Sequence, residues 1–177
     1  WYTSNGSVGG IIMLTNDITR TKEAELELKF SEKKFRESFE NAAIGMAIVS
    51  LKGNWLEVNN TMTEMFGYSK EDFLGYNFND ITYHEDIDKG NELVKELLNN
   101  KANFFHHEKR YIHKNGSTIY AKLSVSIIKD DRKQPVHFIV HITDITSKVI
   151  ANRKVQKTLS QLESILESST QVSIIGT

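Results

Sequence analysis

The sequence predicts an α+β domain in which a five-stranded antiparallel sheet carries its helices on one face and long linker helices flank it. Three observations support this fold. Between residues 42 and 146 the predicted order is two strands, three helices and three strands. The last strands alternate apolar and polar residues, and an Asn115-Gly116 turn joins two of them. The triplet Asp17-Ile18-Thr19 recurs 127 positions later as Asp144-Ile145-Thr146, so one complete repeat lies between partial ones.

The first predicted elements of the complete repeat are a hairpin and a short helix. Residues 46–51 and 55–58 predict two strands joined by a tight turn. A short helix is predicted from Thr61 to Met65. Gly67 follows at the position where helices commonly end in the left-handed conformation.

Two further helices are predicted before the sheet resumes. Ser69-Lys70-Glu71-Asp72 has the pattern of a capping box and opens a one-turn helix. A longer helix is predicted over residues 85–99, with His84 as its cap and carboxylates in its first turn, where the helix dipole favours anions. Its apolar stripe consists of Leu93, Val94, Leu97 and Leu98.

Three strands close the domain, over residues 104–113, 119–127 and 136–143. Lys114-Asn115-Gly116 is expected to form a hairpin turn in which Asn-Gly supplies positive φ. A polar turn over residues 129–135 joins the last two strands.

Helices over residues 20–41 and 147–169 are predicted to flank the domain. In the second, apolar residues follow a 4-3-4 spacing at Val155, Leu159, Leu162 and Leu166. This seam predicts either a helix that packs on its own domain or a short coiled coil that joins two identical chains. Two heptads do not decide between them, because isolated helices of this length are marginal unless packed.

The composition excludes several classes of function. The 177 residues have a formal net charge of −1, which gives no general attraction to nucleic acid or to an anionic membrane. The absence of cysteine excludes disulfides, thiol nucleophiles and Cys-ligated metals. No apolar run approaches the roughly 20 residues that span a bilayer, and no catalytic motif occurs. We therefore expect a non-catalytic, cytoplasmic segment without direct membrane contact, and this leaves membrane anchoring of a longer parent open.

Five of the six histidines lie on predicted strands: His106, His107, His113, His137 and His141. His137 and His141 alternate with Phe138 and Val140, so we expect them to face away from the core. No carboxylate or cysteine stands at ligand spacing, so these residues predict surface or interface histidines rather than a metal site.

A set of short segments covers the central repeat from end to end, over residues 35–42, 45–47, 58–60, 66–69, 71–75, 81–86, 108–116 and 144–146. As a set, these segments resemble the PAS domain family, in its form with a PAC-type C-terminal half. The resemblance implies the PAS fold and divides the chain into five parts. These are the last strands of a preceding PAS domain (1–19), an entry helix (20–41), a complete PAS domain (42–146), a linker helix (147–169) and the first strand of a following PAS domain (170–177).

The resemblance also implies a pocket between the inner face of the sheet and the helices. Its expected lining residues are Asn60, Met65, Phe73, Phe78, Ile81, Leu93, Leu97, Leu123 and Val140. We expect large apolar side chains to fill this space, and a non-covalent ligand is the alternative. The absence of cysteine excludes a LOV-type flavin adduct and a thioester chromophore. Haem is not expected, because residues 85–99 lack the histidine that haem-binding PAS domains place on this helix.

The Asp-Ile-Thr triplets mark the joints between a sheet and the next helix. Thr146 is expected to cap the exiting helix, which contributes about 1 kcal/mol, and Asp144 is expected to pair with a cation such as Arg110. One interpretation is a cap and a surface ion pair. The other, which the resemblance to PAS signalling domains implies, is that Asp144 and Thr146 couple the sheet to the helix, as Asp17 and Thr19 do at the first joint. The two interpretations are compatible.

From the resemblance we expect a sensory, dimerising and signal-relay module of a multi-PAS bacterial signalling protein, above all a sensor histidine kinase of a two-component system. Two alternatives remain open, a receptor whose pocket holds a small molecule or cofactor and a structural spacer between signalling domains. The expected partners are a second copy through the linker helices, the neighbouring PAS domains and an output domain of the parent. Fold alone does not identify the signal.

Overall fold

The computed structural model describes residues 2, 4–7, 19–99 and 101–174. The chain divides into two compact units, residues 1–38 and 39–177. The first unit holds most of helix α1 (Thr19–Glu40), and the second holds an α+β domain followed by helix α5 (Thr146–Ile174). The predicted strand before the first triplet, and Asp17 itself, lie outside the described residues.

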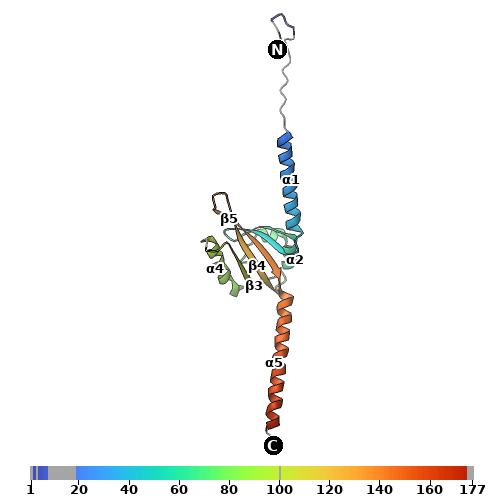
Figure 1. Ribbon diagram of the computed structural model, residues 1–177, viewed down its shortest axis with the longest axis vertical. Helices are drawn as coiled ribbons and strands as arrows, with labels where there is room; N and C mark the ends of the chain where they lie inside the picture. The colour runs from blue at the N-terminus through green and yellow to red at the C-terminus, as the bar shows by residue number, and fades with distance from the viewer. Residues whose placement is uncertain (1, 3, 8–18, 100, 175–177) are drawn as a thin grey trace. The chain divides into compact units, whose positions relative to one another are not determined.

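The domain is built on a five-stranded sheet in which every neighbouring pair of strands is antiparallel, as predicted. The strands lie in the order β2-β1-β5-β4-β3, and Figure 1 labels three of them, β3, β4 and β5. Their bounds are β1 Gly45–Ser50, β2 Trp55–Val58, β3 Phe104–Ile112, β4 Thr118–Lys129 and β5 Pro135–Asp144. The last strand therefore returns to the centre of the sheet, where it pairs with β1 on one side and with β4 on the other.

Short helices cover the inner face of this sheet: α2 (Asn60–Phe66), α3 (Lys70–Leu74), the 3-10 turn η1 (His84–Asp86) and α4 (Ile87–Leu98). The predicted capping box is confirmed, because Asp72 N donates to Ser69 Oγ at 3.1 Å and Ser69 N donates to Asp72 Oδ2 at 3.0 Å. Gly67 ends α2 with a φ of 74°, the left-handed conformation expected there.

The segment predicted as one helix over residues 85–99 is divided. It begins as η1, and α4 starts only at Ile87. The prediction that His84 caps this helix is wrong, because His84 lies inside η1 and makes no cap. Asp86 occupies the cap position of α4 without a side-chain cap bond, since its carboxylate binds Arg110, a stronger charged partner.

The predicted turn at Lys114-Asn115-Gly116 is present but differs in detail. Gly116 takes the positive φ of 86°, and Asn115 does not. The side chain of Asn115 instead accepts a hydrogen bond from Ser117 N at 2.9 Å. One glycine is therefore enough to close this hairpin.

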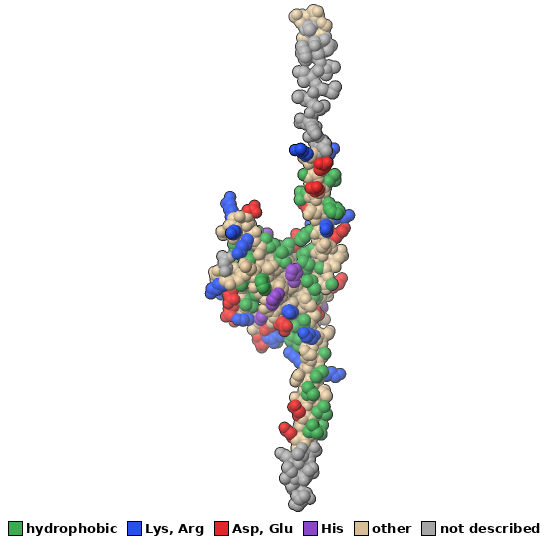
Figure 2. Space-filling model, viewed as in Figure 1, with side chains coloured by type: hydrophobic (Ala, Val, Ile, Leu, Met, Phe, Trp, Pro, Cys, Tyr) green, Lys and Arg blue, Asp and Glu red, His purple; other side chains and the backbone are tan. Residues whose placement is uncertain are grey.

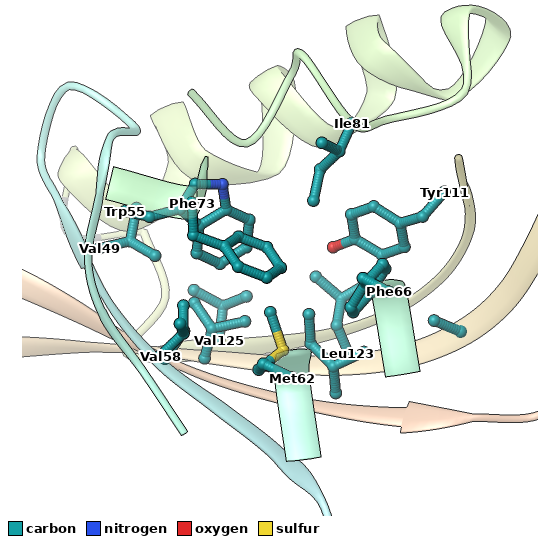
Figure 3. Close-up of a cluster of buried hydrophobic side chains, with 14 of the residues drawn as sticks. Val49, Trp55, Val58, Met62, Phe66, Phe73, Ile81, Tyr111, Leu123 and Val125 are labelled. Carbon is teal, nitrogen blue, oxygen red and sulfur yellow. The ribbon is translucent and has the colours of Figure 1, made fainter. Parts of the chain in front are cut away.

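The core lies between the inner face of the sheet and the helices. The buried residues of β4 follow the predicted alternation: Ile119, Ala121, Leu123 and Val125. Two helical aromatics, Phe66 and Phe73, meet two strand aromatics, Trp55 and Tyr111 (Figure 3). These rings pack edge to face, with centroids 5.2, 5.5 and 6.1 Å apart. Such pairs add stability beyond the area they bury.

Helix α5 begins one residue after β5 ends, with Ile145 between them. It continues to Ile174, so residues 170–174, which the sequence predicted as part of a strand, are helical. A strand there would need backbone partners from another strand, whereas a helix pairs its N–H and C=O groups within the segment. Residues 175–177 lie outside the described part of the chain.

Candidate functional site

A small cavity lies between the sheet and the helices. Its volume is about 40 Å³, which is room for a few water molecules. Most of its walls come from the strands, and α4 contributes Gly90 and Val94. The lining residues are Val49, Trp55, Phe78, Gly90, Val94, Phe105, His107, Lys109, Tyr111, Leu123, Val125, Phe138 and Val140.

The structure separates the predicted pocket residues into groups. Those that line the cavity are Phe78, Leu123 and Val140. Those that are buried in the core outside its lining are Phe73, Ile81 and Leu97. Met65 and Leu93 are only half-buried, and Asn60 is exposed, so the prediction for Asn60 is wrong. Helix α2 turns Met62 and Phe66 inward, four residues apart on one face, which places Asn60 off that face.

The preceding residue, Asn59, is fully buried, and its side-chain amide uses all four of its hydrogen-bonding positions. Its Nδ2 donates to Phe39 O at 2.9 Å and to Ile44 O at 3.0 Å. Its Oδ1 accepts from Met46 N at 2.9 Å and from Met62 N at 3.1 Å. This side chain therefore joins the end of α1, the start of β1 and the first turn of α2.

The most unusual residue in the lining of the cavity is a lysine. Lys109 is 6% exposed, and its Nζ donates to Thr82 Oγ1 at 2.9 Å. The same Nζ lies 4.5 Å from the ring centroid of Tyr111 and 5.2 Å from that of Phe78. Burial disfavours the charged form and lowers the pKa of Lys109 to about 8, although the nearby carboxylate of Asp86 opposes the shift.

His107 also faces the cavity, which corrects the prediction that the strand histidines lie on the surface. Burial is the largest cause that lowers the pKa of His107, followed by the charge of Lys109. Every second residue of β3 lies on the same face of the sheet. Phe105 and Tyr111 lie on the core side, so His107 and Lys109, which come between them at this spacing, lie there too. That alternation was a signal in the sequence that could have identified both residues.

Arg110 points to the other face of β3 and binds the start of α4. Its Nη2 donates to Asp86 Oδ1 at 2.7 Å and to Glu85 Oε2 at 2.8 Å, and its Nε donates to Asp86 Oδ2 at 3.0 Å. The guanidinium lies 4.3 Å from the ring centroid of Tyr83. Its hydrogen bonds are the largest cause that lowers the pKa of Asp86.

The predicted pairing of Asp144 with Arg110 is therefore wrong. Strand β4 separates β3 from β5, so Arg110 and Asp144 are not on neighbouring strands. Asp144 Oδ1 instead accepts from Thr146 N, at 2.7 Å, in the first turn of α5. The carboxylate thus binds an N–H group at the positive end of the helix.

Thr146 contacts the sheet rather than capping the helix. Its Oγ1 accepts from Tyr120 N at 3.0 Å, and Ile145 N donates to Tyr120 O at 2.8 Å. Arg153, two turns along α5, donates to the hydroxyl of Tyr120 at 2.8 Å, and its guanidinium lies 4.8 Å from the ring centroid. Both backbone groups and the side chain of Tyr120 therefore attach the start of α5 to β4. The sequence did not predict this role for Tyr120. The corresponding Thr19 begins α1, and its side chain lies outside the described residues.

A groove of about 250 Å³ connects these two sets of contacts. Its walls include Asp86 and Arg110 on one side and Ile145, Val149 and Arg153 on the other. The charged contacts of η1 and the first two turns of α5 thus share one surface.

The apolar seam predicted in α5 faces solvent within this chain. The exposed fractions are 56% for Val155, 47% for Leu159, 52% for Leu162 and 65% for Leu166. Figure 2 shows hydrophobic side chains gathered along this part of α5. The structure therefore does not support the interpretation that this seam packs on its own domain.

Within the residues that the structure describes, no group of three or more His, Cys, Asp or Glu side chains is placed to hold a metal ion. Within the same residues, no helix has both the length and the hydrophobicity needed to cross a membrane.

Comparison with known proteins identifies related domains. A family model described as "PAS domain" matches residues 43–147. The chain is 38% identical over 115 residues to the Escherichia coli (strain K12) protein named "Probable diguanylate cyclase DgcE", a match covering 65% of this chain and 10% of that protein. It is 26% identical over 157 residues to the sensor histidine kinase TmoS of Ectopseudomonas mendocina, which covers 89% of this chain and 16% of that protein.

A solved structure has the same fold. The PAS domain of a protein from Colwellia psychrerythraea superimposes with a TM-score of 0.61 at 22% sequence identity, covering 66% of this chain and 98% of that one. The chain thus spans nearly all of a solved domain but only about a tenth to a sixth of the curated relatives it matches.

Proposed function

This chain belongs to the PAS domain family, and from that premise we propose that its complete domain is a non-catalytic signal-relay module that passes a change in the sheet to α5. The observation that carries the proposal is the attachment of α5 to Tyr120 through both backbone groups and the hydroxyl of that residue. Tyr120 continues into the β4 residues that line the interior cavity. A shift of β4 would therefore move the first turn of α5.

The contacts of Arg110 support a second connection to the same joint. Arg110 lies opposite Tyr120 in the β3–β4 ladder and binds Asp86 at the start of α4. A displacement of α4 would act on Tyr120 through this pair. Dense packing favours such discrete shifts over gradual deformation.

The proposal includes a homodimer formed by the exposed seam of α5. Valine and leucine at 4-3-4 spacing are the pattern that two helices use to pack against each other in a coiled coil. A second copy of the chain is the occupant that matches this seam best, because it brings an identical stripe. The relayed change would then alter the packing of the paired α5 helices.

The parent protein is proposed to be a cytoplasmic-facing signalling enzyme. Matches to a histidine kinase and to a protein named as a diguanylate cyclase support this class, and both outputs remain candidates. No specific observation favours the alternative of a structural spacer, because a spacer does not need α5 to be attached to β4 through Tyr120.

The relay is tested in the full-length protein by Thr146→Val and Tyr120→Phe, which remove the Oγ1 and hydroxyl contacts while keeping side-chain shape. We expect each variant to reduce the difference in output activity between the signal-on and signal-off states, measured as autophosphorylation or cyclase activity. Thr143→Val, on the exposed side of β5, serves as the matched control. Unchanged signal dependence in both joint variants would refute the relay.

A further inference from the structure

The exposed seam of α5 begins with an amide side chain. Its four apolar residues alternate between the d and a positions of a heptad repeat: Val155 (d), Leu159 (a), Leu162 (d) and Leu166 (a). Asn152 comes three residues before Val155 and seven before Leu159, so it also takes an a position. The side chain of Asn152 is exposed, as are those of the apolar residues. The seam is therefore polar at the end that lies next to the domain.

The domain of the same chain does not cover Asn152. The face of α5 that is turned toward the sheet carries Ile145, Val149 and Arg153, which line the groove beside Tyr120. Asn152 precedes Arg153 by one position, and consecutive residues of a helix point about 100° apart. Among the described residues, the amide of Asn152 has no hydrogen-bond partner. Its donors and its acceptor can therefore bind a group from another molecule.

An asparagine at an a position is known from coiled coils to select one arrangement of the helices at a cost in stability. The cost arises because an amide buried against an apolar side chain leaves its polar groups unsatisfied. When two asparagines meet at the same height, the carbonyl oxygen of one accepts a hydrogen bond from the amide of the other, which offsets that cost. Two identical helices bring the same residue together along the whole seam only when they are parallel and in register.

We propose that the α5 helices of two copies pair in parallel and in register, with Asn152 of one copy hydrogen-bonded to Asn152 of the other. This inference rests on the α5 homodimer proposed above and deepens it, because it identifies the residue that sets the alignment. Lys148, at the preceding d position, is exposed and would bring two like charges together, so the paired segment begins at Asn152. Farther along, Glu163 at an e position would lie beside Thr158 of the second copy, where no like charges meet.

An antiparallel pair is less compatible with the attachment of α5 to the sheet. In the antiparallel alignment that opposes Leu159 to Leu162 of the second copy, Ile174 would lie beside Ser147 of that copy. Ser147 belongs to the first turn of α5, which contacts the sheet through Tyr120. The end of each helix would then meet the domain of the other copy. Parallel helices avoid this contact and keep Asn152 beside its own copy.

Cross-linking of the whole chain tests the alignment, because the chain has no cysteine and each variant then carries a single thiol. Val155→Cys and Leu162→Cys, both at d positions, should each form a disulfide-linked dimer under mild oxidation. In an antiparallel pair a residue meets its own copy only at the centre of symmetry, so two positions seven residues apart cannot both link. Gln161→Cys places the thiol on another face of the helix and should stay unlinked.

The role of Asn152 is measured with Asn152→Leu. Sedimentation equilibrium should show that this variant lowers the dissociation constant of the dimer about tenfold, whereas Gln161→Leu, which adds the same side chain on another face, should leave it unchanged. A mixture of Val155→Cys and Leu166→Cys chains reports the antiparallel alignment, which opposes these two positions. Peptide mass spectrometry should find this mixed link absent in the wild-type background and present with Asn152→Leu.

The outcomes separate this inference from the proposals on which it rests. A dimer that links at only one or neither of the d positions, or that forms the mixed 155–166 link with Asn152 in place, would overturn the parallel register and leave the dimer itself standing. A dissociation constant that Asn152→Leu does not lower would overturn the role of Asn152. A monomeric wild-type chain would overturn the α5 dimer and this inference with it. None of these results bears on the Tyr120 joint, whose test is separate.

Discussion

Arg110 and Tyr120 are directly opposite each other on β3 and β4, and each is bound to a different helix. Arg110 holds the η1–α4 segment through Asp86 and Glu85. Tyr120 holds α5 through its backbone and its hydroxyl. Helices α4 and α5, which are separated in the sequence by three strands, are therefore connected through one cross-strand pair, and each connection can be removed separately.

Replacing Arg110 with methionine should lower the free energy of unfolding by about 1–3 kcal/mol. The change removes three side-chain hydrogen bonds to carboxylates and leaves the partly buried Asp86 without its main cationic partner. Urea unfolding measures the loss, and amide exchange should increase first in η1 and the start of α4. Lys89→Met is the control, because its pair with Glu92 is exposed and should contribute less than about 0.5 kcal/mol. Equal effects of the two substitutions would contradict this account.

Asn59→Ala should destabilise the domain by about 3–5 kcal/mol. It removes the side-chain partner of two backbone carbonyls and two N–H groups, of which Met62 N keeps a second bond to Asn59 O at 3.2 Å, and each group left unsatisfied is costly. The neighbouring Asn60→Ala should change the unfolding free energy by less than about 0.5 kcal/mol, since the side chain of Asn60 is exposed. Chemical unfolding of the two variants gives a direct comparison, and a small loss for Asn59→Ala would show that the four bonds are replaceable.

Lys109→Met should make the domain more stable at pH 7, with an advantage that shrinks as the pH rises. Between pH 8 and 10.5 the unfolded wild-type chain keeps the lysine proton that the folded chain has released, so wild-type stability rises with pH. The full difference corresponds to about 3 kcal/mol. Urea unfolding from pH 7 to 10.5 measures it, with Lys122→Met, which removes an exposed charge from β4, expected to run parallel to wild type. An advantage of Lys109→Met that stays constant with pH would show that folding does not lower the pKa of Lys109.

Leu159→Glu should shift the chain from dimer to monomer. It places a charge in the middle of the exposed α5 seam, where a second copy would bury it. Light scattering coupled to size-exclusion chromatography measures the mass. Gln161→Glu adds the same charge on another face of the helix and should leave the dimer intact. A wild-type chain that is monomeric at high concentration would refute the dimer.

The sequence predicted the sheet, its capping box and its hairpins because these depend on local patterns. The alternation along β4 and the Ser69–Asp72 box each need only a few neighbouring residues. The exact positions within short helices were less predictable. A shift of one residue in α2 is what exchanges the exposed Asn60 for the buried Asn59.

The candidate site was harder to predict because it depends on strand order. The two predicted hairpins imply that β4 lies between β3 and β5, and the predicted ion pair overlooked that this order separates Arg110 from Asp144. It also brings Tyr120, a residue with no motif, against α5. Lys109 was missed for a different reason: its charge argued against burial, although its place in the β3 alternation favoured it.

The single residue between β5 and α5, Ile145, fixes the rotation of α5 about its own axis as well as its connection to the sheet. Each residue in a helix turns the chain by about 100°, so inserting one residue after Thr146 would rotate the seam at Leu159 by that amount about the helix axis. An insertion of seven residues would restore it to within about 20°. The sheet therefore fixes the rotation of α5 about its own axis. The direction in which the seam faces depends on the number of residues between β5 and the seam, and not on the length of the helix alone.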